Sequence, residues 1–89
     1  MDFEWDQKKA VANEQKRGVT FEEATEVFAD DYSSTVPDPD HSAEEERSLI
    51  LGVTRTGKSL IVSFTDRGDR IRIINARSMT PSERRAYEQ

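Results

Sequence analysis

Arginine side chains dominate the possible chemistry in the C-terminal half of this chain. Residues 47–89 contain nine lysines and arginines, eight of them arginine, and four acidic residues. Residues 1–46 contain four lysines and arginines and 14 acidic residues. A guanidinium group is planar and permanently charged, and it can pair with two phosphate oxygens at once. The C-terminal half is therefore a candidate site for a phosphate-bearing ligand, although the net charge of the chain is −5.

The same charges have a simpler explanation. A basic half can lie beside an acidic half and form ordinary solvated ion pairs with it, and most charge runs do no more than this. Charge alone leaves both interpretations open.

Metal and thiol chemistry have few possible ligands here. The chain has no cysteine and one histidine, His41, which excludes thiolate sites and sites with several histidines. A lone histidine in a loop can act as a general acid or base near neutral pH, but a surface histidine usually has no such role. We expect no metal and no other cofactor.

One segment matches a nucleotide-binding motif by its letters. Residues 52–59, GVTRTGKS, fit the phosphate-loop pattern, whose mechanism needs a strand before the loop and a helix after it. Residues 60–65, LIVSFT, are instead β-branched and alternating, as in a strand. The segment is predicted to be a hairpin turn without a nucleotide function.

Capping residues predict three helices that position these groups. Asp6 can cap the first, with Gly18 as its left-handed end, and Thr20–Glu23 and Thr80–Glu83 are capping-box pairs that open the other two. The predicted helices cover residues 7–17, 21 to about 28, and 81 to about 87. Phe3 and Trp5, before the first helix, are expected to be core anchors rather than a base-stacking platform.

The first predicted helix carries a polar stripe. Lys9, Asn13, Lys16 and Arg17 recur at helical spacing and share one face. The stripe could bind phosphate, or it could be the solvated side of an amphipathic helix.

A hydrophobic period of two from Arg47 onward predicts an antiparallel meander. A short strand over residues 33–36 should precede it, and turns should lie at residues 55–58 and 66–69. The residues expected to face the core are Leu49, Leu51, Val53, Leu60, Val62, Phe64, Ile71 and Ile73.

The other face of this predicted sheet is half polar. Small Gly52 and Ser63 would leave room for a phosphate-bearing ligand there, or the face is the ordinary solvated side of an antiparallel sheet, which is the commoner case. The residues assigned to it are Ile50, Gly52, Ile61, Ser63, Thr65, Arg70, Arg72 and Ile74.

These elements predict the α+β class, with two N-terminal helices, a meander of three to four strands and a C-terminal helix. A chain of 89 residues is expected to form one domain, residues 1–89. No apolar run approaches the roughly 20 residues of a membrane span, and the N-terminus lacks a signal peptide's apolar stretch. We expect a cytoplasmic protein that does not bind a membrane.

Several motifs along nearly the whole chain, taken together and in order, resemble the BrnT toxin family. They are FEWD at 3–6, NEQKRGVTFEEA at 13–24, PDPDHS at 37–42 leading to EER at 45–47, RIRIINAR at 70–77, and ERRAY at 83–87. The resemblance implies a RelE-like fold and a ribonuclease that stops translation. It also implies a BrnA-type antitoxin whose ribbon-helix-helix part binds DNA, so that DNA is contacted only through the antitoxin. Arg17 and Asn75 depart from the family, which usually has histidine and serine there.

The implied chemistry assigns roles to individual residues. Metal-free RNA cleavage must align the 2′-hydroxyl with the phosphate, move two protons and hold extra negative charge. The expected catalytic residues are Arg72, Arg77, His41 and Tyr87, with Arg77 placed after the last strand, and the expected RNA-binding residues are Lys16, Arg67, Arg70 and Arg84. The alternative is a non-catalytic RNA- or protein-binding module on the same fold, which the departure at Arg17 would permit.

Overall fold

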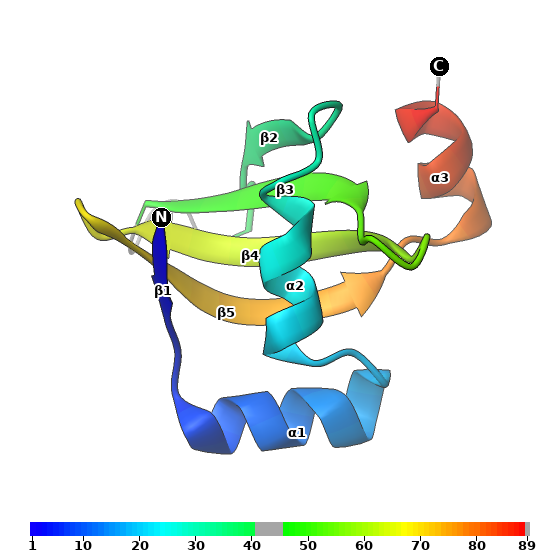
Figure 1. The fold of residues 1–89 in the computed structure, drawn as a ribbon. Helices are drawn as coiled ribbons and strands as arrows, with labels where there is room; N and C mark the ends of the chain where they lie inside the picture. Colours follow the sequence, from blue (N-terminus) through cyan, green and yellow to red (C-terminus); the bar gives the residue numbers. More distant parts are fainter. Residues whose placement is uncertain (41–45, 89) are drawn as a thin grey trace.

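A five-stranded sheet forms the body of the computed structural model (Figure 1), which describes residues 1–40 and 46–88. The elements are β1 Asp2–Glu4, α1 Gln7–Arg17, α2 Phe21–Val27, β2 Ser34–Pro37, β3 Arg47–Val53, β4 Ser59–Asp66, β5 Arg70–Ser78 and α3 Pro81–Tyr87. Strand order is β1-β5-β4-β3-β2, in which β2 to β5 form the predicted antiparallel meander. The sequence did not predict β1, which adds a fifth strand to the sheet, parallel to β5.

The three predicted helices are confirmed, and their capping residues act as expected. The Asp6 carboxylate accepts two backbone N–H groups, and Gly18 ends α1 with φ of 72°. Both capping boxes, Thr20–Glu23 and Thr80–Glu83, have their side-chain and backbone hydrogen bonds in place. None of the helices in the described part of the chain is long and apolar enough to cross a membrane.

The core lies between α2 and one face of the sheet, which α2 crosses in Figure 1. Buried side chains from α1, α2, β3, β4 and β5 and from the α1–α2 connection form it: Ala10, Val19, Phe21, Ala24, Val27, Ile50, Leu60, Val62, Phe64, Ile73 and Ala76. Phe3 and Trp5 pack against this cluster in edge-to-face contacts with Phe28 and Phe21. Their predicted role as core anchors is therefore confirmed.

The predicted facing of β3 was wrong. Ile50 lies opposite Val62, and Gly52 opposite Leu60, on the face that α2 covers. A Cβ on Gly52 would lie 2.8 Å from Cγ1 of Val27, so glycine is needed there for the close approach of α2 and leaves no room for a ligand. Leu49, Leu51 and Val53 therefore occupy the opposite face.

A β-bulge in β5 changes which side chains share a face. Ser63 lies opposite Asn75, but Phe64 lies opposite Ile73, so Ile74 is an extra residue without a partner in β4. Arg72, Asn75 and Arg77 consequently share one side of β5. The face opposite α2, called the second face below, includes Arg47, Leu49, Leu51, Val53, Ile61, Ser63, Thr65, Arg72, Asn75 and Arg77. The expectation that Arg77 follows the last strand, and that Ile74 shares a face with Arg72, was wrong.

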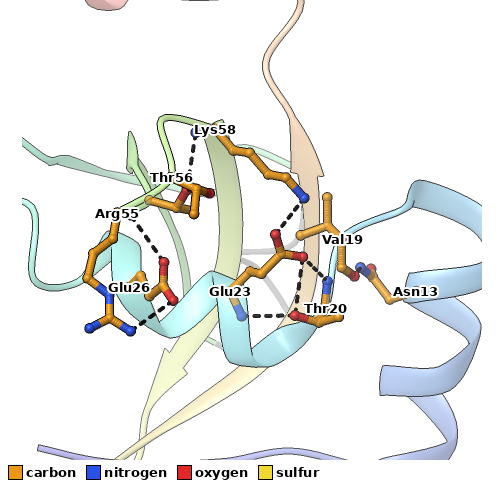
Figure 2. Close-up of polar contacts among 9 residues, drawn as sticks. Asn13, Val19, Thr20, Glu23, Glu26, Arg55, Thr56 and Lys58 are labelled. Carbon is orange, nitrogen blue, oxygen red and sulfur yellow. Dashed lines mark hydrogen bonds and ion pairs between the residues drawn. The ribbon is translucent and has the colours of Figure 1, made fainter.

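The phosphate-loop-like segment is the predicted hairpin turn. The Thr54 N–H donates to the Lys58 carbonyl across the turn, and β4 follows directly. Figure 2 shows two contacts from α2 to this turn: Glu23 with the Lys58 ammonium, and Glu26 with the backbone and guanidinium of Arg55. These residues join the hairpin to α2.

A single buried amide joins α1 to the sheet. The Asn13 Nδ2 donates to the carbonyls of Val19, at 2.9 Å, and Ala76, at 3.0 Å, while Oδ1 accepts the Ala76 N–H at 3.2 Å. The amide thus pairs with both backbone groups of Ala76, as a neighbouring strand would. Asn13 is 8% exposed, so its predicted place on the solvated side of the helix was wrong.

Replacement of Asn13 by alanine should destabilise the protein strongly. The variant leaves two carbonyls and one N–H without their partner in a buried position, and we expect a loss of roughly 2–4 kcal/mol in the free energy of unfolding. Urea denaturation of Asn13→Ala beside Gln15→Ala, an exposed position of the same helix, measures the difference. Equal stability of the two variants would contradict a structural role for the amide.

Candidate functional site

A cleft of about 180 Å³ lies on the second face. Leu49, Ile61 and Ser63 line it from β3 and β4, Asn75 and Arg77 from β5, and Asp38 and Asp40 from the segment after β2. The cleft therefore combines a guanidinium, an amide and two carboxylates above an apolar floor. Such a set can hold a phosphate and offers groups that could orient or accept a proton.

Arg77 is held rigidly at this cleft. Its guanidinium donates to both carboxylate oxygens of Glu83 in α3, at 2.8 and 2.9 Å, and to the Ser78 carbonyl at 3.2 Å. These bonds to Glu83 raise the pKa of Arg77, so its charge is permanent. The two bonds to Glu83 and the one to Ser78 use three of its five N–H donors, and two remain for a ligand.

A group of arginines lies next to this cleft on the sheet. Arg72 donates to Glu4 in β1 at 2.9 Å, and Arg70 lies 3.7 Å from the other oxygen of the same carboxylate. Arg67 contacts the Thr65 hydroxyl, and Thr65 is the direct neighbour of Arg72 across β4 and β5. The structure therefore brings three predicted phosphate-binding arginines together around one strand end.

Tyr87 and Arg84 lie elsewhere, on α3. The Tyr87 hydroxyl is 3.0 Å from Oδ2 of Asp30 and 2.9 Å from the Tyr32 carbonyl, and it lines a separate hollow of about 570 Å³ between α3 and β2. Burial, and then the hydrogen bond with Asp30, raise the pKa of Tyr87. The hydroxyl therefore keeps its proton. Arg84 is exposed and lines neither this hollow nor the cleft.

Lys16 and His41 complete the predicted set. Lys16 lies in α1 and lines a third hollow, of about 230 Å³, where α1 passes the edge of β5. His41 lies outside the described residues, and its neighbour Asp40 lines the cleft. Among the predicted residues, only Arg77 lines the cleft in the described part of the chain.

Four residues in or beside the cleft were not predicted as site residues from the sequence. Asp38, Asp40 and Asn75 line the cleft, and Arg47 lies opposite Thr65 with a buried Nε that has no hydrogen-bond partner in the described structure. The signal for Asp38 was its position between two prolines, which fixes the chain around it. Arg47 belonged to the family motif at 45–47, but nothing in that motif assigned it a role. The described residues contain no group of three or more histidine, cysteine or acidic side chains that could hold a metal ion.

The fold is that of a known class of small bacterial ribonuclease toxins. The chain superposes on the crystal structure of the Brucella abortus ribonuclease toxin BrnT with a TM-score of 0.71 and 20% sequence identity, over 90% of this chain and 97% of that one. At this identity the likeness defines the fold alone.

The family follows from the sequence itself. The model of the family described as the ribonuclease toxin BrnT of type II toxin–antitoxin systems matches residues 5–83. The chain therefore belongs to the BrnT family of ribonuclease toxins. A search of the curated proteins finds no match to it.

The ion pair between Arg77 and Glu83 predicts a specific acid response. The hydrogen bonds from Arg77, and then from the Thr80 backbone, lower the pKa of Glu83 from 4.5 to about 2. Because the pKa is lower in the folded state, the stabilisation is complete above the unfolded value near 4.5 and is lost as the pH falls towards 2.

A carboxyl NMR titration measures this pKa directly. We expect Glu83 to titrate near 2 in the unmodified protein and closer to its ordinary value in Arg77→Ala. In Glu83→Gln, the free energy of unfolding should depend less on pH over the same interval. An ordinary pKa for Glu83 in the unmodified protein would mean that the pair does not persist in solution.

Proposed function

We propose that this protein cleaves RNA in the cleft of the second face, without a metal ion, and that the cleavage inhibits translation. The observation that carries the proposal is the position of Arg77, whose charge is fixed at the cleft by Glu83 while two of its donors stay available. Arg72, three residues before Asn75, extends the positive surface along the same face.

The proposed reaction is an internal transesterification. The 2′-hydroxyl oxygen attacks the adjacent phosphorus, the bond to the 5′-oxygen breaks, and a 2′,3′-cyclic phosphate is left. Negative charge increases on the phosphoryl oxygens in the transition state, where preorganised guanidinium donors stabilise it more than they stabilise the ground state. We assign this role to Arg72 and Arg77, and ground-state RNA contacts to Lys16, Arg67, Arg70 and Arg84.

Two protons must move in this reaction. We propose His41 as one transfer group, because its neighbour Asp40 lines the cleft. Tyr87 is the other candidate, and its raised pKa favours a role as proton donor to the leaving 5′-oxygen and disfavours a role as base. Its hydroxyl would have to leave Asp30 to reach the cleft.

The family also suggests the setting of this activity. We propose that a BrnA-type antitoxin with a ribbon-helix-helix part neutralises the protein, and that the protein contacts DNA only through this antitoxin. We also propose that residues 1–89 form one RelE-like domain and that the protein is cytoplasmic. The membership of a type II toxin family supports these proposals.

Loss of either catalytic arginine should reduce RNA cleavage. Removing a contact that strengthens in the transition state costs about 2–4 kcal/mol, so we expect rates of Arg72→Ala and Arg77→Ala to fall roughly 30- to 1000-fold. Stability should change little in Arg72→Ala, since the ion pair with Glu4 is partly exposed and such pairs are worth about 1 kcal/mol or less.

Arg55→Ala provides the matched control. Arg55 is also an arginine with one acidic partner, Glu26, but it lies on the hairpin turn beside α2, away from the cleft. Cleavage rates and melting temperatures are measured on the same samples. Full activity in both cleft-side variants would remove these arginines from the proposed site, and a large fall in the melting temperature of Arg72→Ala would show that the role of Arg72 is structural.

Binding of the antitoxin should depend on salt. A partner that neutralises the toxin must cover a basic surface, so charge complementarity should contribute to the interface. We expect the affinity to fall between about 50 and 500 mM NaCl, over which the Debye length shrinks severalfold. Calorimetry at several salt concentrations tests this, and an affinity independent of salt would contradict an electrostatic interface.

A further inference from the structure

The hollow between α1 and β5, called the α1 groove here, has an unusual lining. It contains three cationic side chains and no carboxylate, in a chain whose net charge is −5. Its lining residues are Lys9, Ala12, Asn13, Lys16, Arg17, Ile74 and Asn75. The α1 groove is therefore locally positive on an acidic protein, which favours an anionic ligand.

The cations of the α1 groove are not engaged by the protein. Lys9, Lys16 and Arg17 form no ion pair within residues 1–40 and 46–88, whereas cations elsewhere in the chain do, among them Arg55, Lys58, Arg70, Arg72 and Arg77. Internal charge balance thus does not explain the three cations, and their full charge is available to a ligand.

The floor of the α1 groove is rigid. Asn13 forms it, and its amide is held by three hydrogen bonds to the backbone of Val19 and Ala76. The bulge in β5 places Ile74 and Asn75 at the rim. The cations therefore surround a fixed surface, which reduces the ordering cost of binding.

Asn75 connects this groove with the cleft. It is exposed, and it lines both hollows, although Lys16 and Arg17 belong to α1 and Arg77 belongs to the second face. β1 pairs with β5 only as far as Arg72, so no strand separates the two hollows at this part of the edge. A flexible chain could pass around Asn75 from one hollow into the other.

We propose that the α1 groove binds phosphates of the single-stranded RNA that flanks the scissile bond. The inference rests on the proposed function and assigns the path of the substrate: from the cleft, over Asn75, to Lys16 and Arg17. A protein partner fits the α1 groove less well, because its apolar lining is limited to Ala12 and Ile74 and offers no pocket for an aromatic or aliphatic anchor.

Salt-dependent binding tests this path. The probe is a 12-nucleotide RNA with 2′-O-methyl groups throughout, which cannot be cleaved because the attacking hydroxyl is blocked. Each phosphate contact on a single strand contributes about 0.7 to the slope of log K against log salt. We expect Lys16→Gln/Arg17→Gln to lower the slope by about 1.4 and to weaken binding at least tenfold at about 50 mM salt.

Lys8→Gln/Arg85→Gln is the matched control. It removes the same two charges from exposed residues of α1 and α3 that line neither the α1 groove nor the cleft. Its slope should stay within about 0.5 of that of the unmodified protein. Equal slopes for the two double variants would overturn the inference.

Cleavage of two substrates separates this inference from the proposed function. A dinucleotide occupies the cleft alone, so the Lys16→Gln/Arg17→Gln substitutions should lower kcat/KM for a 12-nucleotide RNA at least tenfold more than they lower kcat/KM for the dinucleotide. Failure of the unmodified protein to cleave either RNA would refute the proposed function. Normal cleavage of both RNAs by the variant would refute the path alone, and normal RNA binding with weakened antitoxin binding would assign the α1 groove to the protein partner instead.

Discussion

The pairing of the Asn13 amide with Ala76 determines how α1 is attached to the sheet. α1 buries only Ala10 and Asn13, so apolar packing alone holds it weakly against the sheet. The edge of β5 beyond β1 would also present unpaired backbone groups, which invite another chain to pair. The Asn13 amide attaches α1 to the sheet, and it also forms hydrogen bonds with the backbone N–H and carbonyl of Ala76 that would otherwise be unpaired at this edge. The position of the α1 groove and of its cations follows from this contact.

The bulge at Ile74 has a comparable effect on the second face. In a regular strand, Arg72 and Arg77 would point to opposite sides, since they are five positions apart and side chains alternate along a strand. The extra residue reverses the alternation, so that both arginines lie opposite β4 residues of the second face while Ile73 and Ala76 stay in the core. The active surface proposed here therefore depends on a local irregularity of the backbone.

Local signals in the sequence predicted the local structure well. The capping residues Asp6, Gly18, Thr20 and Thr80 located all three helices, because a cap depends on residues within one turn. The facing of β3 could not be predicted, since residues 49–53 are apolar apart from glycine and fit either face. Long-range features were also out of reach: the three residues of β1 pair with β5 almost 70 positions later, and the bulge has no sequence signature. For the site, charge and family resemblance led to Arg77, but the carboxylates of the cleft became visible only in three dimensions.

The attachment of α3 makes it thermodynamically linked to Arg77. None of its residues is buried, and Glu83 and Tyr87 hold it to the sheet and to Asp30. An anion that draws Arg77 away from Glu83 weakens the attachment of α3, and a partner that holds α3 in place strengthens the hold on Arg77. Linkage requires these two effects to be equal in free energy. The attachment of α3 therefore changes when an anion binds Arg77 in the cleft. A macromolecule that binds α3 changes the affinity of the cleft for that anion without entering the cleft.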